Sequence, residues 1–588
     1  MKQFFKMMFA SAMGVFVAVG LLIIAGIFLV IGAVQSVSGS ASYTPPVNAV
    51  LKISLNGQLV DNKIDNPWEQ YLGENELTLS LKDVLHSIKA AKNNSSISGI
   101  YLNAGSFSAG SASIEAIRRE LKDFKESGKF IVAYGDSYTQ GAYFLCSEAD
   151  KVYMNPQGML GLVGMATQGM FYKNLLKKLG VEMMIFKVGT YKGAVEPFML
   201  DKYSDENREQ IQSYVHSIWN NLTEGIAESR SISVADVQAF TNSGLAFGNP
   251  SKAVECGLID ELKYESEVED LVKGLAGQMG EKLKTTSVDK AKLISIPQAT
   301  SQNEIAVLYA EGEIVSDVTS TPYYSEQAIT GKVAKELRKL KNNDNVKAVV
   351  LRVNSPGGSA YVSEQIWHAV VELKEVKPVV VSMGNVAASG GYYISCAADK
   401  IVAEENTLTG SIGIFGMFPN ASGLFEKISL TTDIVKTNTY ADLGDLSRPM
   451  REDEKALIQA YVERGYETFI TRCADGRGLS KEQIDAVGQG RVWTGEQALE
   501  RGLVDELGGL DKAVNAAADL AELFDYQVTM HSSSTDFFTD FLQKQLDDMK
   551  VSVVRDILGS EYEYYKNINL IRSTSGIQAR LPYDMNPL

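Results

Sequence analysis

The chain has 588 residues, of which 45% are hydrophobic and 22% are charged, a composition typical of a globular protein too long for a single core. Its net charge of −16 and the absence of any long Lys/Arg run exclude nucleic acid as an expected partner, because phosphates favour basic surfaces. The cysteines lack CxxC spacing and predict neither a metal site nor a disulfide framework, and we expect buried single residues at Cys146, Cys256, Cys396 and Cys473.

The N-terminal segment is predicted to be a membrane anchor. Residues 7–34 carry no charge, and a helix needs about 20 apolar residues to cross a bilayer, whereas a cleaved signal has an apolar region of about 7–15 residues. Cleavage near the small residues 38–42 is the alternative. Because Lys2 and Lys6 precede the segment and the next lysine is Lys52, we expect a cytoplasmic N-terminus and a body outside the cytoplasmic membrane.

The rest of the chain contains two copies of one sequence unit. Residues 99–164 align without a gap on residues 348–413, at a constant offset of 249. The run Ala-Asp-Lys at 149–151, for example, recurs at 398–400. With the anchor, the repeat predicts five segments along the chain. They are the anchor at 1–45, a first repeat at 46–275, a linker at 276–302, a second repeat at 303–525, and a C-terminal helix and tail at 526–588.

Each copy is predicted to have an α/β fold. Val349–Val353 and Pro378–Met383 are short runs rich in β-branched residues, which suit buried parallel strands. Residues 363–373 between them have helical spacing. This alternation is typical of strand–helix–strand units. Beyond residue 525 we expect an amphipathic helix over 536–557 and a late strand over 576–581.

Two glycine-rich turns follow these strands and offer a nucleophile. Residues 354–359 and 387–392 should lie together at the carboxyl ends of neighbouring parallel strands, where ligand sites form. Ser389 is framed by small residues at the start of a helix, which suits a nucleophile whose oxyanion is held by backbone N–H groups. A serine that only packs at a tight turn is the alternative. The candidate oxyanion donors are Gly358 and Gly390, with Gly357 as the substitute for Gly358.

A serine nucleophile needs a base, and lysine is the better candidate than histidine. We expect surface or helix-packing roles for the four histidines, His86, His216, His368 and His531. A lysine can act as a base if burial keeps its amine neutral. Lys192 is the candidate, because its competitor Lys187 recurs as Lys436 and has the pattern of a shared structural position.

The two copies differ at these candidate positions in a complementary way. Ser389 corresponds to Gln140, and Lys192 corresponds to Ala441. Residues 354–358 correspond to residues 105–109, which lack the glycine pair. The second copy therefore keeps the serine and the glycine turn, whereas the first copy keeps the lysine. This complementary loss predicts one site shared between the two copies.

The motifs of both copies resemble the long, two-repeat form of the signal peptide peptidase A family, also called protease IV. They are Ser355–Ser359, Ala387–Tyr392, Gly189–Gly193, Arg491–Gly495 and Gly502–Asp505. The resemblance implies tandem domains of the Clp protease/crotonase superfamily, Ser389 as nucleophile, Lys192 as base and no cofactor. It also implies a membrane-bound homotetramer whose substrates are remnant signal peptides. Gly193 stands where other members can carry Ser, so the residue that orients the Lys192 amine stays unassigned.

Two other functions remain open at this point. A crotonase-like acyl-coenzyme A enzyme would use the same backbone pocket, and a catalytically inert membrane scaffold would use neither the serine nor the lysine. A further set of apolar residues is expected either to line a substrate groove or to make core and subunit contacts: Met159, Leu160, Met165, Met170 and Phe171.

Overall fold

The computed structural model describes Gly14 and residues 42–63, 78–296, 301–316, 328–531 and 576–580. Among the helices in these ranges, none combines the length and the apolar character needed to cross a bilayer. The anchor predicted over 7–34, Gly14 apart, and the helix predicted over 536–557 lie outside the described residues.

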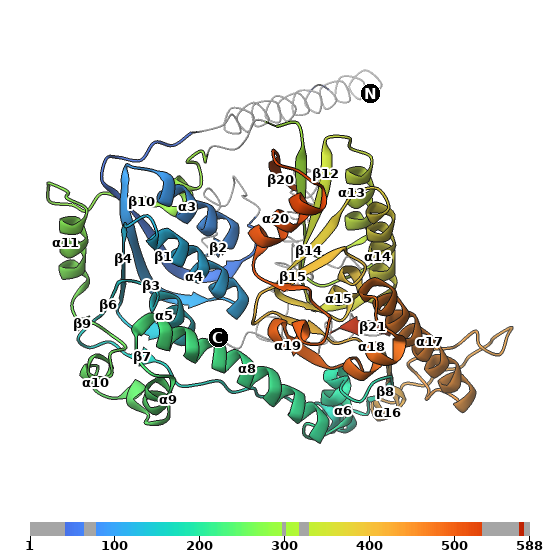
Figure 1. Ribbon diagram of the computed structural model, residues 1–588. Coiled ribbons are helices and arrows are strands. Elements are labelled where there is room, and N and C mark those ends of the chain that lie inside the picture. Colours follow the sequence, from blue (N-terminus) through green and yellow to red (C-terminus); the bar gives the residue numbers. More distant parts are fainter. Residues whose placement is uncertain are drawn as a thin grey trace, which may run out of the picture.

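The first half of the chain folds around a parallel sheet, at the left of Figure 1. Its strands follow the order β10–β1–β3–β4–β6–β9, and β2 pairs with β1. Their bounds are β1 Ala49–Val60, β2 Thr78–Ser80, β3 Ile97–Ser108, β4 Phe130–Gly135, β6 Lys151–Met154, β9 Glu261–Leu262 and β10 Thr285–Ser287. A small separate pair is formed by β5 Tyr138–Thr139 and β7 Leu160–Gly161. The first-half helices are α3 Leu81–Asn93, α4 Ser111–Lys125, α5 Gln140–Cys146, α6 Lys173–Leu179, η1 Gly193–Val195, α7 Glu196–Met199, α8 Asp205–Arg230, α9 Val234–Asn242, η2 Leu245–Phe247, α10 Ser251–Glu255, α11 Glu265–Leu275 and α12 Val288–Ala291.

The second half repeats this architecture at the right of Figure 1. Its sheet has the order β18–β16–β14–β12–β11–β20, and β15 pairs with β14 and β19. The bounds are β11 Glu304–Glu311, β12 Val346–Ser355, β14 Val379–Ala388, β15 Lys400–Ala403, β16 Leu408–Gly410, β18 Val492–Thr494, β19 Glu506–Leu507 and β20 Gln527–His531. The second-half helices are α13 Gly331–Lys341, α14 Ala360–Lys374, α15 Gly390–Ser395, α16 Ser422–Lys427, α17 Glu452–Arg477, α18 Lys481–Val487, α19 Gly495–Leu499 and α20 Leu510–Leu520.

The sequence repeat is also a structural repeat. Helices α4 and α14, and strands β6 and β15, correspond at both ends with the offset of 249 found in the sequence. Buried contacts recur as well: the Tyr143 hydroxyl donates to the Leu258 carbonyl at 2.6 Å, and the Tyr392 hydroxyl donates to the Leu503 carbonyl at 2.9 Å. The α/β fold in two tandem copies is therefore confirmed.

Segments outside the two expected repeats add strands to the sheets. Residues 276–302, expected as a linker, contain β10 and α12, and β10 pairs in parallel with β1. Strand β20, in the segment expected as a C-terminal helix and tail, pairs in parallel with β11. Both additions cover a sheet edge that would otherwise expose unpaired N–H and C=O groups.

A third sheet joins the two halves. Its strand order is β13–β21–β17–β8, with β8 Glu182–Lys187, β13 Gly357–Ser359, β17 Phe415–Asn420 and β21 Gly576–Arg580. The first-half strand β8 runs antiparallel to the second-half strand β17. This pairing carries the segment after β8, which contains Lys192, into the second half.

Helix α8 also contacts both halves, and Figure 1 shows it running beneath them. Toward its start, the Gln210 side-chain oxygen accepts from the Val492 N–H at 3.0 Å. Toward its end, the Gly225 carbonyl accepts from the Arg118 guanidinium at 3.0 Å. Helix α8 thus bridges the two halves of the chain.

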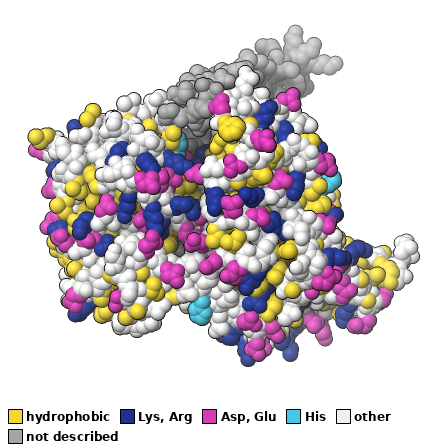
Figure 2. Space-filling model, viewed as in Figure 1, with side chains coloured by type: hydrophobic (Ala, Val, Ile, Leu, Met, Phe, Trp, Pro, Cys, Tyr) yellow, Lys and Arg dark blue, Asp and Glu magenta, His cyan; other side chains and the backbone are white. Residues whose placement is uncertain are grey.

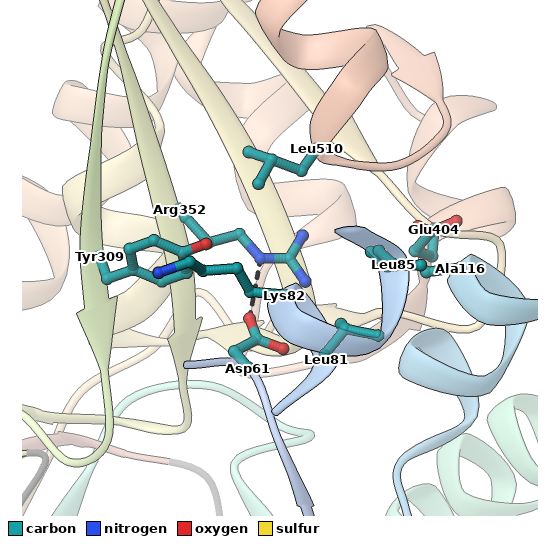
Figure 3. Close-up of a pocket in the computed structure, with 9 residues that line it drawn as sticks. All are labelled: Asp61, Leu81, Lys82, Leu85, Ala116, Tyr309, Arg352, Glu404 and Leu510. Carbon is teal, nitrogen blue, oxygen red and sulfur yellow. Dashed lines mark hydrogen bonds and ion pairs between the residues drawn. The ribbon is translucent and has the colours of Figure 1, made fainter. Parts of the chain in front are cut away.

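A buried ion pair adds a third connection (Figure 3). Arg352 of β12 donates from Nε to Asp61 Oδ2 at 2.8 Å, and both side chains are at most 5% exposed. Arg352 also donates to the Ser382 hydroxyl at 3.0 Å and to the Met383 carbonyl at 2.9 Å. The pair borders a cavity of about 30 Å³, which is on the scale of one water molecule. These contacts hold β12 and β14, the strands that lead into the candidate site.

The surface agrees with the mixed composition. Figure 2 shows acidic and basic side chains interspersed over the face in view. Ion pairs also connect the two halves. For example, the Arg119 guanidinium of the first half donates to the Glu404 carboxylate of the second half at 2.8 Å.

Candidate active site

Ser389 stands at a strained turn between strand β14 and helix α15. Its backbone angles are φ 56° and ψ −112°, a sparsely populated conformation that costs about 1–3 kcal/mol in a non-glycine residue. The Ser389 N–H donates to the Gly410 carbonyl at 2.8 Å, and the Ser389 carbonyl accepts from the Tyr393 N–H at 2.8 Å. These bonds hold the turn and present the hydroxyl at the end of the strand.

Lys192 reaches this hydroxyl from the other half of the chain. Its Nζ lies 2.9 Å from Ser389 Oγ, 3.0 Å from Ser411 Oγ and 3.1 Å from the Ser411 carbonyl oxygen. Ser389 and Lys192 are 0% and 1% exposed. All three partners of the amine are uncharged oxygens, and burial lowers the pKa of Lys192 to about 7. At neutral pH a large share of the amine is therefore unprotonated and able to accept a proton.

Glycines make room for this lysine. A Cβ added to Gly490, which has φ +80°, would lie 2.7 Å from the Lys192 Cβ, and one added to Gly413 would lie 3.2 Å from its Cδ. The Tyr191 N–H donates to the Gln489 carbonyl at 2.9 Å. The loop before β18 therefore clamps the lysine segment by backbone contact.

A buried polar network supports the same segment from α8. The Gln210 amide donates to the Tyr191 carbonyl at 2.8 Å and to the Asn207 side-chain oxygen at 2.8 Å. The Asn207 amide donates to Glu196 at 2.7 Å. A Cβ on Gly193 would lie 2.5 Å from the Asn207 amide nitrogen, so Asn207 fills the space that a side chain at 193 would need. The contact with Asn207 thus explains why this chain has glycine at position 193, where other members of the resembled family can carry Ser.

Ser411 is the site residue that the sequence analysis missed. It is 1% exposed, has φ 51°, and its N–H donates to the Arg491 carbonyl at 2.7 Å. Its hydroxyl and carbonyl both contact the Lys192 amine. The repeat held a signal for it, because at the offset of 249 Ser411 corresponds to the apolar Leu162.

The glycine turn abuts the start of α15. Gly357 has φ +97° and Gly358 has φ +149°, which only glycine adopts without strain. A Cβ on Gly357 would lie 2.6 Å from the Gly390 backbone nitrogen. The Gly357 N–H donates to Ser355 Oγ at 3.1 Å, and the Ser359 N–H donates to the Ile314 carbonyl at 2.7 Å. The N–H groups on both sides of Gly358 thus have protein partners.

The corresponding turn in the first half is closed. Gln140 stands where the second half has Ser389, and its side-chain oxygen accepts from the Gly164 N–H at 3.0 Å. Ala441, the counterpart of Lys192, is exposed in the segment after α16. The turn at Gln140 therefore has a packing role. The first-half segment that contains Lys192 instead contacts Ser389 in the second half.

The remaining candidates lie elsewhere. Lys187 ends β8 opposite Phe415. His86 contacts the Ile294 carbonyl at 3.0 Å, His531 contacts Glu304 at 2.9 Å, and both His216 and His368 are exposed. None of these side chains hydrogen-bonds to Ser389 in the part of the chain that the structure describes.

The five apolar groove candidates separate in the structure. Met159 and Met170 are exposed, Leu160 lies in the first-half core, and Phe171 contacts Tyr203 edge to face. Met165 packs in the cluster that contains Ala388, the residue before Ser389. Met165 therefore packs beside the site, and Phe171 contacts Tyr203, which belongs to the same cluster.

The structure places a buried serine in contact with a buried, partly neutral lysine. Both lie beside a glycine turn at the carboxyl ends of parallel strands. This arrangement is typical of a serine hydrolase. Residues 123–278 and 371–524 match peptidase family S49, and residues 301–407 match Clp protease. The chain belongs to peptidase family S49 and is a serine protease. This membership decides against the acyl-coenzyme A and inert-scaffold alternatives.

Curated relatives are similar over most of the chain. Protease 4 of Haemophilus influenzae is 35% identical over 547 residues, which cover 88% of this chain and 86% of that protein. Protease 4 of Salmonella typhi is 37% identical over 525 residues, covering 84% and 83%. A putative signal peptide peptidase SppA of Enterococcus faecium is 34% identical over 245 residues, covering 42% of this chain and 71% of that protein.

Proposed function

We propose that this protease is a membrane-anchored endopeptidase that degrades remnant signal peptides, with Ser389 as nucleophile and Lys192 as general base. The observation that carries the assignment is the 2.9 Å contact between Lys192 Nζ and Ser389 Oγ. It falls within the range of a productive nucleophile–base hydrogen bond. The lowered pKa of Lys192, about 7, supports the same assignment because a protonated amine cannot act as a base.

The proposed reaction is acyl transfer through the serine. Neutral Lys192 takes the proton of Ser389 as the oxygen attacks a peptide carbonyl, and then gives a proton to the leaving amine. Water, activated by the same amine, hydrolyses the ester. The N–H groups of Gly358 and Gly390 hold the oxyanion. Ser411 orients the amine, since its hydroxyl lies 3.0 Å from Nζ.

The substrate class is inferred from relatives and from the anchor. The Enterococcus faecium relative carries the name of a putative signal peptide peptidase. The uncharged residues 7–34, preceded by Lys2 and Lys6, support a single span with a cytoplasmic N-terminus. The catalytic part then lies on the extracytoplasmic side of the cytoplasmic membrane, near the place where released signal peptides remain.

A homotetramer is part of the proposal. The segment that follows β17 exposes large apolar side chains, as subunit contacts require. They are Ile428, Leu430, Ile434, Val435, Tyr440, Leu443 and Leu446. Light scattering of the detergent-solubilised protein tests this point, and a monomer at all concentrations would contradict it.

The function is tested with the full-length protein in detergent and a synthetic signal peptide. We expect cleavage within the apolar region, detected by mass spectrometry, and none with Ser389→Ala. Labelling by a fluorophosphonate probe should be confined to Ser389. Cleavage of soluble polar peptides but not of signal peptides would overturn the proposed substrate class. It would not contradict the roles of Ser389 and Lys192.

A further inference from the structure

Two of the four cysteines, each expected from the sequence to be a single buried residue, lie together in the second half. Cys396 directly follows the last residue of helix α15, and Cys473 lies near the end of α17. Both are free thiols in the structure, are 0% exposed and belong to the second-half core. Burial and, to a smaller extent, a contact with the Cys396 thiol raise the pKa of Cys473. The two thiols are therefore neighbours, although many residues separate them in the sequence.

Helices α15 and α17 approach each other closely at this point. One turn before the two cysteines, the rings of Tyr393 and Phe469 pack with their centroids 4.5 Å apart. One turn after Cys473, a Cβ added to Gly476 would lie 2.1 Å from the Cys396 carbonyl oxygen. The backbone of α17 thus touches the end of α15. A disulfide needs its two Cα atoms within about 7 Å of each other, and close packing of this kind favours that separation.

The first half has no cysteine at the corresponding positions. Helices α8 and α17 correspond, because each has 26 residues and ends in an arginine. Aligning these arginines matches Cys473 to Ile226, and the offset of 249 matches Cys396 to Ser147. Ser147 accepts from the Arg118 guanidinium at 2.9 Å instead. One thiol at either position would be explained as a small packing residue. Two thiols at one contact, neither present in the other copy, indicate a bond between them.

We propose that Cys396 and Cys473 form a disulfide bond in the mature protein and so fasten the helix behind the nucleophile to α17. Helix α15 begins at Gly390, directly after Ser389, and Cys396 stands at its other end. The bond therefore holds the end of the helix that lies away from the site. The inference goes beyond the proposed function but rests on the proposed extracytoplasmic placement, because disulfides persist in that compartment.

The bond forms by exchange with an oxidising disulfide of the compartment. The thiolate of one cysteine attacks a sulfur of the oxidant and forms a mixed disulfide, and the thiolate of the other then displaces the oxidant. The pair loses two protons to water and two electrons to the oxidant, which leaves as two thiols. Because burial raises the pKa of Cys473 and disfavours its thiolate, the exchange takes place during folding, before α17 packs against α15.

A count of free thiols in the full-length protein tests the proposal. The protein is extracted from its membrane in detergent, denatured with an excess of alkylating agent and weighed by mass spectrometry. We expect two alkyl groups, on Cys146 and Cys256, and a peptide in the non-reducing digest that links Cys396 to Cys473. Prior reduction should give four alkyl groups. Four alkyl groups without reduction would overturn the proposal.

Two matched variants assign the bond to its cysteines. Cys473→Ala should free Cys396 and give three alkyl groups without reduction. Cys256→Ala should keep the bond and give one alkyl group, on Cys146. Three alkyl groups in Cys256→Ala would place the bond at Cys256 and overturn the assignment.

Thermal unfolding tests whether the bond fastens the helices. Reduction should lower the unfolding midpoint of the unaltered protein by about 5 °C, because a disulfide that closes a long loop stabilises the folded state. The midpoint of Cys473→Ala should not respond to reduction, and an equal response of both proteins would overturn the fastening role. If four thiols are free while Ser389-dependent cleavage of signal peptides persists, the disulfide is refuted and the proposed function stands. A disulfide in a protein that cleaves no peptide would contradict the proposed function alone.

Discussion

Lys192 Nζ lies 2.9 Å from Ser389 Oγ, although the two residues are 197 positions apart and belong to different copies of the repeat. Strand β8 explains this proximity, since it leaves the first half and pairs with β17 of the second. Helix α8 and the loop at Gly490 then hold the lysine segment in place. Two copies thus combine into one site, and the following expectations depend on that geometry.

Removing the amine should abolish activity without unfolding the protein. Lys192→Met keeps most of the side-chain volume, and we expect kcat/KM for peptide hydrolysis to fall by about 10⁴-fold, the scale seen when a member of a catalytic triad is disabled. Lys187→Met is the matched control and should retain activity. A Lys192→Met protein with most of its activity would show that the base is another group.

The activity should depend on pH through Lys192. Because burial lowers the pKa of Lys192 from 10.5 to about 7, the neutral base is present above that pH and is lost as the pH falls through it. We expect kcat/KM to rise with pH and to reach half its maximum near pH 7. A profile whose midpoint lies near 10.5 would show an ordinary, solvated lysine.

Ser411→Ala tests whether this hydroxyl orients the amine. Its oxygen lies 3.0 Å from Lys192 Nζ, and loss of a polar contact to a catalytic group can cost roughly tenfold in rate. We expect kcat to fall more than KM changes. The kinetic pKa should also move downward, because the protonated amine loses an acceptor. An unchanged pH profile would assign Ser411 a packing role only.

Gly490→Ala tests the backbone clamp on the lysine. The added Cβ would lie 2.7 Å from the Lys192 Cβ, so we expect the amine to shift and activity to drop by about 10²-fold. Gly444→Ala is a close control, because Gly444 has a similar φ of +84° but nothing within 4 Å of the added atom. Equal losses in both variants would attribute the effect to backbone strain alone.

Arg352→Met should destabilise the junction of the halves. It leaves the Asp61 carboxylate buried without its partner, a change that costs about 3–5 kcal/mol. Arg338→Met breaks the Arg338–Glu372 pair, whose side chains are 43% and 32% exposed, and should cost about 0–1 kcal/mol. Thermal unfolding followed by circular dichroism compares the two, and similar midpoints would contradict the structural role of the buried pair.

Much of the fold could be predicted from local sequence. The β-branched runs and helical spacing within each copy predicted strands and helices, because side-chain periodicity reports which face is buried. The offset of 249 predicted equivalent helices such as α4 and α14. The comparison of copies also selected Ser389 and Lys192 from among many serines and lysines, since a repeat supplies an internal reference for each position.

The tertiary structure decided what depends on contacts between distant segments. Three features join parts of the chain that share no local pattern. They are the pairing of residues 285–287 with β1 as strand β10, the contact of Ser411 with Lys192, and the position of Ala579 beside Gly357. Periodicity shows that a side chain is buried but not which group lies opposite it. The lowered pKa of Lys192 has the same origin, because burial from several elements at once creates the environment that keeps the amine neutral.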